Sequence, residues 1–511
     1  MLDTTAGYHR ERFHRTALLR YAAAMGLAMV LTGCGSGGGG LLPSPGGKST
    51  TTASTQLYAD GVNRFTAGDF TVAATDFQQV VQGYPAASEA AMSTLYLGRA
   101  QYELGQYALA EQTLTQAITL ITSGNYAADP YYWRGRARHK QGLLDLARED
   151  YAWVINNAAT SQWIDNALLQ TGNSWFDQAN YPGARSWYQQ VLAGYPASSS
   201  VDDAQYQIGR SYHAELNYAA ALAEYRQLAV PNSTSTLADN AHYQIGRVYY
   251  DQAVAALAQN QITAAQGLLH QAITQLAGLL SPHTITLYAD YSAENDAQYY
   301  SARSWHRLAG TVTPVDAVQL QQARALYKSV MAVPGSLLAD NAHFQYAMTY
   351  YDETNYQTAI VELDTLLSPA VTGYADTSAF DEAYLYRGMA RHRLGNSGDN
   401  FVLADRDYRM VTDWYGATSI YADNAHYERG KLQYDQQDWA KASTLFELLV
   451  KPVTPLPYPD TSAYDQAWYF LGRTYENMGR NVDATAAYNT LIASYPASFY
   501  APLAQARLPL P

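Results

Sequence analysis

The sequence predicts an all-α protein built as a solenoid of helix pairs, because a small residue returns at a fixed interval along the chain. In the first half the interval is 37 residues, and a repeat of this length is typical of stacked structural units. The regular positions are Gly61, Gly98, Gly135, Gly172, Gly209 and Gly246. The series continues less evenly through Ala302, Ala347, Gly388, Gly430 and Gly472, which makes about eleven repeats in all.

The residues around each small position predict the first helix of a repeat. Around Gly209, Ala204 and Ile208 alternate with Tyr206 and Tyr212, so small and aromatic residues fall on adjoining faces of a 3.6-residue period. An aspartate stands just before this pattern in several repeats, where its carboxylate can accept first-turn N–H groups. These aspartates are Asp202, Asp239, Asp340 and Asp423.

A second helix follows in each repeat. Twelve residues after the small position most repeats carry alanine, and sixteen residues after it they carry a large residue, as in Ala221 and Tyr225. A small residue beside a bulky one predicts close crossing of an antiparallel helix pair. Pro85, Pro196 and Pro496 each follow a tyrosine 24 residues after the small position, and we expect them to end the second helix.

This pattern resembles the tetratricopeptide repeat: small, aromatic, aliphatic and glycine positions in the first helix, alanine and an aromatic in the second, and proline near the end. The resemblance covers residues 57–508. It implies a right-handed superhelix whose concave groove is lined by the fifth and ninth positions of the first helices. The 37-residue spacing and the Tyr–Pro–Ala endings resemble the bacterial envelope branch of the family, which includes the lipoprotein of the β-barrel assembly machine and the Tol–Pal coordinator.

The N-terminus predicts export and lipidation. Residues 1–33 combine a basic leader with a short apolar run, as in a signal peptide. The run ends in Leu31–Thr32–Gly33–Cys34, which resembles the lipobox of bacterial lipoproteins and makes Cys34 the lipidation site. Cys34 is the only cysteine of the chain, so no disulfide can form within one chain. A secretory signal with an incidental cysteine is the alternative. Gly35 at the next position favours, by resemblance, the outer membrane facing the periplasm.

The rest of the chain divides by regularity. Residues 34–56 are rich in Gly, Ser, Thr and Pro and predict a flexible tether. Residues 57–250 form regular repeats one to five and the start of six, residues 251–317 are irregular, and residues 318–508 hold repeats seven to eleven. In repeat six the first helix is expected to extend through Gln259, with Ala265 and Leu269 as its small and large pair after an insertion of seven. The irregular stretch is either a bend or protrusion, or drifted repeats without a special role.

No enzyme constellation is present in the sequence. It contains no Walker-type phosphate loop, no cysteine cluster and no His–Glu–x–x–His motif. His242, His343 and His426 share one repeat position, but neighbouring first helices are about 10 Å apart, whereas zinc holds its ligands at about 2 Å. We therefore expect no metal, no cofactor and no enzyme activity. The formal net charge of −13 argues against nucleic-acid binding.

Aromatic and cationic residues at the fifth and ninth positions predict a binding groove. The two positions lie one helical turn apart on one face, and an arginine fork beside a phenol suits carboxylates or sugar hydroxyls. The family's carboxylate-clamping groove uses Lys and Asn there, so that ligand is not implied. The alternative is internal pairing with Asp203, Asn240, Asp296 and Glu382. The candidate groove residues are Tyr206, Arg210, Tyr243, Arg247, Tyr299, Arg303, Tyr427, Tyr469 and Arg473. Arg99, Arg136 and Lys431 also stand at the ninth position.

These features together predict a lipid-anchored periplasmic scaffold. We expect it to bind envelope proteins or peptides through its concave face, and the resemblance implies a role in outer-membrane or cell-envelope assembly. It would meet the membrane through its lipid anchor only. The alternative is a glycan-binding or polysaccharide-export scaffold, with peptidoglycan or polysaccharide as the ligand.

Overall fold

The computed structural model describes residues 53–231, 234–280, 292–368, 377–395, 399–451 and 458–508. Within these ranges every regular element is a helix, so the predicted all-α class is confirmed. The expected leader, the lipidation site Cys34 and nearly all of the tether lie outside the described residues. The chain forms two compact units. Of the described residues, unit 1 holds those up to Ala241 and unit 2 holds those from His242 onward.

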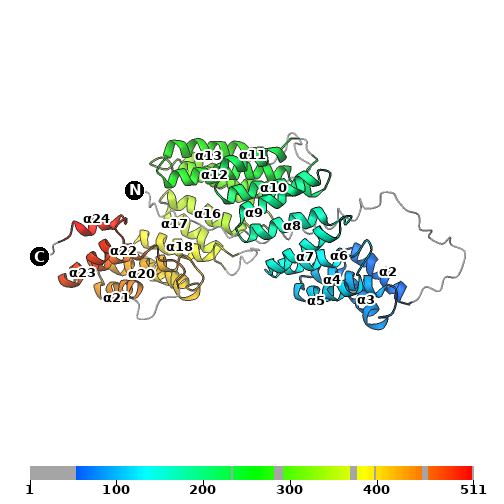
Figure 1. Cartoon of the computed structure of the whole chain (residues 1–511). Helices are drawn as coiled ribbons and strands as arrows, with labels where there is room; N and C mark the ends of the chain where they lie inside the picture. The colour runs from blue at the N-terminus through cyan, green and yellow to red at the C-terminus, as the bar shows by residue number, and fades with distance from the viewer. Residues whose placement is uncertain are drawn as a thin grey trace. The chain divides into compact units, whose positions relative to one another are not determined.

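Unit 1 is a succession of antiparallel helix pairs, drawn from blue to cyan-green in Figure 1. Each helix packs against the next along the chain. The second helices α3 and α9 end just before the Tyr–Pro–Ala segments, as predicted. The helices are α2 (Ala53–Thr66), α3 (Phe70–Gly83), α4 (Ala90–Glu103), α5 (Tyr107–Leu120), α6 (Asp129–Lys140), α7 (Leu144–Asn157), α8 (Ile164–Asp177), α9 (Tyr181–Gly194), α10 (Ser200–Ala214) and α11 (Tyr218–Leu228).

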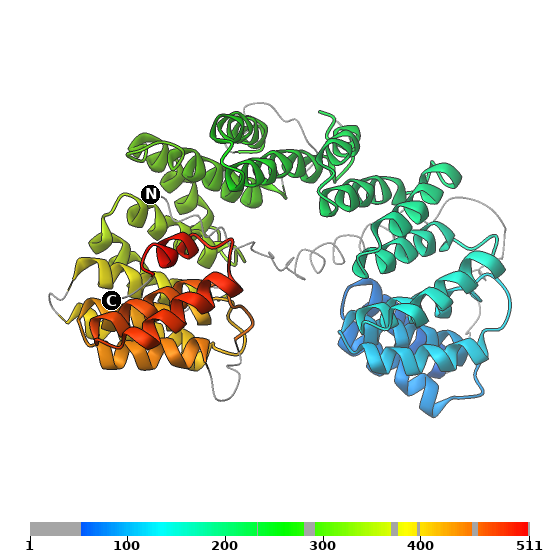
Figure 2. The same cartoon turned by 60° about the vertical axis from the view of Figure 1, so that its left-hand side comes forward.

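Unit 2 continues the same scheme, and its last pairs, α20 with α21 and α22 with α23, lie side by side in Figure 2. A short π-helical turn, η2 (Met410–Trp414), follows α19. The helices are α12 (Ala238–Ala258, which begins in unit 1), α13 (Ile262–Ala277), α14 (Glu294–Ala309), α15 (Ala317–Met331), α16 (Ala339–Asp352), α17 (Tyr356–Leu366), α18 (Phe380–Leu394), α19 (Asn400–Arg409), α20 (Ala422–Asp435), α21 (Trp439–Val450), α22 (Tyr464–Asn477), α23 (Asn481–Ser494) and α24 (Tyr500–Gln505).

The glycine of the repeat is where the two helices of a pair cross. A Cβ atom added to Gly135 would lie 2.6 Å from Cε1 of Tyr151, and one added to Gly430 would lie 2.5 Å from Cε1 of Phe446. The large residues under the glycines are fully buried. The predicted packing of a small residue against the large residue sixteen positions later is therefore confirmed. The regular pairs are Gly61 with Phe77, Gly98 with Leu114, Gly135 with Tyr151, Gly172 with Tyr188, Gly209 with Tyr225, Gly430 with Phe446 and Gly472 with Tyr488.

The first helices form the inner layer of each unit. Besides packing on their own second helix, the first helices of consecutive repeats touch each other directly, as α4 does with α6 and α16 with α18. Because the first helices of consecutive repeats lie this close together, they form the inner side of the curve of their unit. Residues that lie on this side of the first helices therefore face the concave surface of their unit.

Repeat six departs from the prediction. The first helix is extended as expected and ends at Ala258, but Gly246 packs against Leu276 and not against Leu269. Leu276 lies 30 positions after the glycine, against 16 in the regular repeats. The insertion is therefore fourteen residues rather than seven. In an antiparallel pair, a first helix that runs two turns past the crossing needs a second helix two turns longer to return to it.

The aspartates at the start of the first helices join consecutive repeats. Asp423 Oδ1 accepts a hydrogen bond from the N–H of Asn424 at 2.8 Å, which is the first-turn contact that the sequence predicted. Its Oδ2 accepts another, at 2.8 Å, from the N–H of Ala463 in the next repeat. Asp340 does the same with Ala379 at 3.0 Å. Both carboxylates are buried. Asp423 satisfies backbone groups of two repeats at once, and Asp340 connects the side chain of Asn341 to the backbone of the next repeat.

Histidine–aspartate pairs also connect consecutive first helices. His139 Nε2 lies 2.8 Å from Asp177 Oδ2, His306 Nε2 lies 2.9 Å from Asp352 Oδ2, and His392 Nε2 lies 3.2 Å from Asp435 Oδ2. In each pair the histidine is four residues after its own small position and the aspartate five residues after the next one. The same contact thus recurs in register in these three places.

Replacing Gly430 by alanine should lower the free energy of unfolding by about 1 to 3 kcal/mol, because the new methyl group would overlap the ring of Phe446. Gly267 in the exposed side of α13 has nothing within 4 Å of an added Cβ, so Gly267→Ala should instead stabilise by up to about 1 kcal/mol through helix propensity. Urea denaturation of the two variants would measure the difference. Equal midpoints would contradict the steric role assigned to the repeat glycine.

Candidate functional site

The cations at the ninth position lie over aromatic rings of neighbouring first helices. Arg210 lies 4.9 Å from the ring centre of Phe176 in the preceding repeat, and Arg303 lies 4.9 Å from that of Tyr250. Arg247 and Lys431 stack on rings of the following repeat, Tyr300 at 4.8 Å and Phe470 at 5.1 Å. Such contacts contribute about 0.5 to 2 kcal/mol each. They hold the cations in place on the inner layer of their unit.

The tyrosines at the fifth position mostly pack inside the helix layers. Tyr243, Tyr299, Tyr427 and Tyr469 are each less than a tenth exposed, and their rings contact other rings of the same unit, as Tyr243 does with Tyr300 at 5.7 Å. Tyr206 is half-buried against Tyr225. The four buried rings therefore offer no open stacking surface. Whether the candidate groove residues bind a ligand stays a prediction.

Two candidate arginines also have an acidic neighbour on their own helix. Arg247 Nε lies 3.6 Å from Asp251 Oδ2, and Arg473 Nε lies 3.5 Å from Glu476 Oε2. Asp203 and Glu382, two of the acids named above as alternative internal partners of the arginines, lie in different electrostatic surroundings. Burial, reinforced by Asp202, raises the pKa of Asp203 to about 6. Glu382 is acted on by a ninth-position arginine, because the positive charge of Arg303 favours its ionised form.

Glu382 of α18 is buried near both positively and negatively charged groups. Burial raises its pKa to about 7, Asp381 adds to the rise, and a hydrogen bond with Tyr421 together with the charges of Arg303 and Arg307 opposes it. Arg303 and Arg307 belong to α14, two repeats earlier. The inner layer of unit 2 therefore brings groups from α14, α18 and the start of α20 within electrostatic reach of one another.

Glu382→Gln should change how the stability of the protein depends on pH. The folded chain keeps the Glu382 proton up to about pH 7, whereas the unfolded chain releases it near the ordinary pKa of about 4.3. Between these values the folded state binds more protons, so this group makes stability fall as pH rises. The variant keeps a hydrogen-bonding side chain without the charge, and it should gain stability relative to the wild type between pH 4 and pH 8. If the urea midpoints of the variant and the wild type differed by the same amount at pH 4 and at pH 8, this prediction would be contradicted.

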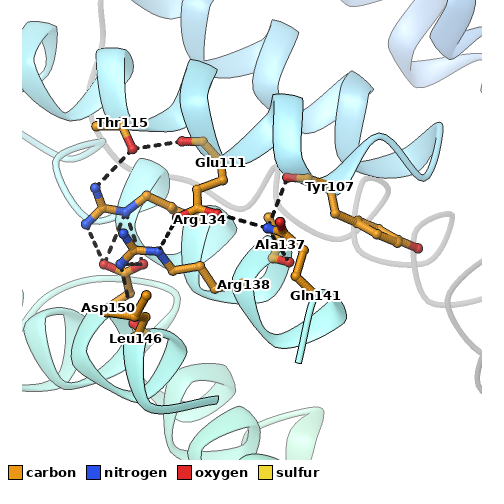
Figure 3. Close-up of polar contacts among 9 residues, drawn as sticks. All are labelled: Tyr107, Glu111, Thr115, Arg134, Ala137, Arg138, Gln141, Leu146 and Asp150. Atoms are coloured by element: carbon orange, nitrogen blue, oxygen red, sulfur yellow. Dashed lines mark hydrogen bonds and ion pairs between the residues drawn. The ribbon is translucent and has the colours of Figure 1, made fainter. Parts of the chain in front are cut away.

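A second arginine cluster in unit 1 is an internal ion-pair network. In Figure 3, Arg134 and Arg138 of α6 both point at Asp150 of α7, with Arg134 Nη2 at 2.6 Å and Arg138 Nη1 at 2.9 Å. Arg138 also binds Glu111 of α5 at 2.8 Å, and Gln141 donates to Glu111 as well. Asp150 is 2% exposed. The network lies on the side of α6 that faces its second helices and connects three helices of two repeats.

The same network recurs in unit 2. Arg387 and Arg391 of α18 both bind Asp407 of α19, at 2.5 and 2.6 Å, and both bind Asp364 of α17. Sequence reasoning missed these residues, although a signal was present. In both repeats arginines stand one residue before and three residues after the glycine, and an aspartate immediately precedes the buried tyrosine.

Asp150→Asn should destabilise unit 1 by about 3 kcal/mol or more, because it leaves two buried guanidinium groups short of their shared counter-charge. Asp145→Asn is the matched control. Asp145 pairs with Arg148, but its side chain is 84% exposed, so its loss should cost less than about 1 kcal/mol. Thermal or urea unfolding would compare the two. A small effect at both positions would show that the Asp150 network is not a stabilising element.

The three histidines that share a repeat position contact residues of their own repeat or link. His343 Nε2 lies 3.2 Å from Glu362 Oε2 on α17, and His426 Nδ1 lies 3.0 Å from the hydroxyl of Tyr458. His242 hydrogen-bonds Gln275 of α13. Across the described ranges no group of three His, Cys, Asp or Glu side chains is placed to hold a metal ion. These contacts fit packing histidines.

The helix-pair architecture and the sequence agree on the class of protein. A profile of the tetratricopeptide repeat matches residues 58–130 and 427–499, which are the first two and the last two repeats. The fold is a tetratricopeptide-type solenoid, a scaffold class suited to binding other proteins. Within the part of the chain that the structure describes, no helix is both long enough and apolar enough to cross a bilayer.

Several solved structures are similar to parts of this chain. The C-terminal part of a tetratricopeptide-repeat protein from Cytophaga hutchinsonii is 15% identical, covers 54% of this chain and 94% of its own, and has a TM-score of 0.38. A tetratricopeptide-repeat protein from Parabacteroides merdae is 15% identical over 54% and 92%, with a TM-score of 0.35. Yeast Tom70 is 12% identical over 83% and 96%, with a TM-score of 0.31. Among curated proteins, no sequence matches this chain.

Proposed function

We propose that this protein is a lipid-anchored scaffold of the bacterial cell envelope that binds partner proteins on the concave surfaces of its two units. The observation that carries the binding role is the presence of ninth-position cations on the inner layer of first helices in each unit. Arg210, Arg247 and Arg303 are held there by aromatic rings of adjacent repeats. Stacking on a ring fixes the plane of a guanidinium group, and the N–H donors along its edge are of the kind that recognise carboxylates and backbone carbonyls of a polypeptide.

The burial of the fifth-position tyrosines supports a protein partner over a glycan. A sugar ring is recognised by stacking on an open aromatic face, whereas Tyr243, Tyr299, Tyr427 and Tyr469 are all less than a tenth exposed. Guanidinium edges suit the carboxylates and backbone carbonyls of a polypeptide. We therefore keep protein binding as the proposed function and treat polysaccharide as the competing outcome.

The anchoring part of the proposal depends on sequence alone. Cys34 follows an aliphatic and two small residues after a basic and apolar leader, and a segment rich in Gly, Ser and Pro comes next. Two or more acyl chains would hold such a protein stably at a membrane. By resemblance to envelope lipoproteins, we place the repeats in the periplasm at the outer membrane, with a role in assembling envelope proteins.

Affinity capture from gently solubilised membranes would test the proposal. Partner proteins should copurify with the wild type and be lost at least tenfold from the triple variant Arg210→Glu, Arg247→Glu, Arg303→Glu. Arg409→Glu, Lys441→Glu, Arg480→Glu is the matched control, because it makes the same change of charge at positions with more exposed side chains. Circular dichroism would check that both variants fold.

Cys34→Ser belongs in the same experiment. We expect this variant to keep its partners but to leave the membrane fraction and to lose labelling by fatty acid. If the Arg210, Arg247 and Arg303 triple variant kept its partners, binding would lie elsewhere on the chain. Capture of polysaccharide without protein would favour the glycan scaffold, and membrane retention of Cys34→Ser would refute the lipid anchor.

A further inference from the structure

A cavity of about 380 Å³ in unit 1 is lined by residues of three consecutive helices, α7, α8 and α9. Two tryptophans line it, Trp175 of α8 and Trp187 of α9, and both are partly exposed. The α7 side runs from Glu149 to Ile155. We call this cavity the Trp187 groove. It lies on the side of α8 that faces the second helices, and none of the candidate residues of the inner layer lines it.

The Trp187 groove stands where two other repeats have an ion-pair network. Those repeats carry arginines one residue before and three residues after the glycine, and an aspartate immediately before the buried tyrosine. In the repeat of Gly172 the same three positions hold Thr171, Trp175 and Trp187, and all three line the cavity. The sequence of this one repeat has therefore exchanged a charged network for an aromatic groove.

In the network repeats, arginine side chains occupy the space between two second helices. Arg138 of α6 reaches Glu111 of α5 at 2.8 Å and Asp150 of α7 at 2.9 Å (Figure 3). Arg391 of α18 bridges α17 and α19 in the same way. The repeat of Gly172 has no arginine at these positions, and its space is the cavity. The equivalent place in the fold thus accommodates a guanidinium group that is flanked by acids.

The lining of the groove keeps a negative charge. Its charged residues are two carboxylates, Asp145 and Glu149, and one guanidinium group, Arg148. Arg148 is already engaged, because it pairs with Asp145, donates a hydrogen bond to Ser174 at 2.7 Å and covers the ring of Trp175 at 4.0 Å. Glu149 is exposed, and within the described ranges no cation lies within 4 Å of its carboxylate. One uncompensated negative charge therefore remains, at Glu149.

Trp187 is the aromatic surface of the groove that the protein itself leaves uncovered. It packs partly against the core of unit 1, and in the part of the chain that the structure describes no cation and no second ring stacks on it. On the α7 side, Glu149, Ala152 and Ile155 follow one another at intervals of one turn, so a charged end passes into an apolar one. Such a surface suits an amphipathic cation, whose carbon stem lies on apolar residues while its charged head reaches a carboxylate.

The planar indole and the single carboxylate favour arginine over lysine, because a guanidinium group stacks on an aromatic ring and pairs with a carboxylate along its edge. We propose that the Trp187 groove binds an arginine side chain from a basic segment of a partner protein, with the guanidinium group over Trp187 and paired with Glu149. The formal net charge of −13 attracts such a segment over a longer range. A neutral sugar also stacks on indole, but it gains nothing from the charge of Glu149.

This site deepens the proposed function, on which it rests, by giving the chemistry of one partner segment. It uses none of Arg210, Arg247 and Arg303, so the two ideas fail separately. Loss of partners from that triple variant supports the scaffold even where the Trp187 groove binds nothing. Binding of an arginine peptide in the groove is measured without any envelope partner.

Isothermal titration of the full chain at about 0.15 M salt, where long-range attraction is screened, would test the site with three end-blocked peptides. These are hexaarginine, hexalysine and hexacitrulline. Hexaarginine should bind at least tenfold more tightly than hexalysine, because only the guanidinium group offers a plane for stacking and a fork for the carboxylate. Hexacitrulline has the same shape without the charge, and it should not bind.

Two pairs of variants assign the binding to the groove. Glu149→Gln should weaken hexaarginine severalfold, and Asp177→Asn is its matched control. Asp177 is also an acid of unit 1 with an exposed side chain, but it pairs with His139 and does not line the groove, so its loss should leave affinity unchanged. Trp187→Leu should reduce hexaarginine binding to the level of hexalysine, whereas Trp187→Phe keeps a ring and should retain most of the affinity.

The exposed position of Glu149 keeps the test decisive where Trp187→Leu fails to fold. The proposal is overturned if hexaarginine binds no more tightly than hexalysine, if hexacitrulline binds equally well, or if Glu149→Gln has no more effect than Asp177→Asn. Cellohexaose, a neutral hexasaccharide, completes the titration. If it bound the wild type and hexaarginine did not, the groove would be a glycan site and the arginine assignment would be wrong.

Discussion

The close crossing of two helices at a glycine is the constraint on which the rest of the structure depends. At each regular repeat the backbone of the first helix rests on the ring or branched side chain of the second, and an added methyl group would lie within 2.7 Å of it. This contact sets the spacing within a pair. It also leaves another side of the first helix to face its counterparts in the next repeats. The arginines at the position after the glycine therefore reach rings of neighbouring first helices on the inner layer of their own unit.

Charge in this protein is organised by the same geometry. One residue before the glycine and three after it, the first helix faces the second helices, and arginines there are buried in ion pairs with Asp150 or Asp407. One residue after the glycine it faces the inner layer, and cations there stack on rings. Neighbouring arginines of one helix thus make different contacts: Arg134 and Arg138 pair with Asp150, whereas Arg136 stacks on Tyr102 and Trp133.

Sequence reasoning could predict the helix pairs because their determinants are local and periodic. It could also predict that Arg210, Arg247 and Arg303 each share a face of their own helix with the fifth-position tyrosine one turn earlier, since a single helix fixes that. It could not predict which rings these arginines contact, because Phe176, Tyr300 and Tyr250 come from other repeats. It missed the Arg134, Arg138 and Asp150 network for a related reason. Two repeats have arginines and an aspartate at the same distances from the glycine. These distances suggest a contact only once the crossing of the two helices is known.

By itself, the sequence determined the class of fold, the repeat glycines with their large partners and the helix ends at Tyr–Pro–Ala, because each of these follows from steric fit and backbone geometry over a few turns. Only the tertiary structure decided the length of the repeat-six insertion, the second hydrogen bond of Asp340 and Asp423, and the burial of the fifth-position tyrosines. Each of these depends on where the next helix lies. A carboxylate that binds two repeats, or a ring that is buried between helices, cannot be recognised from the sequence of its own helix alone.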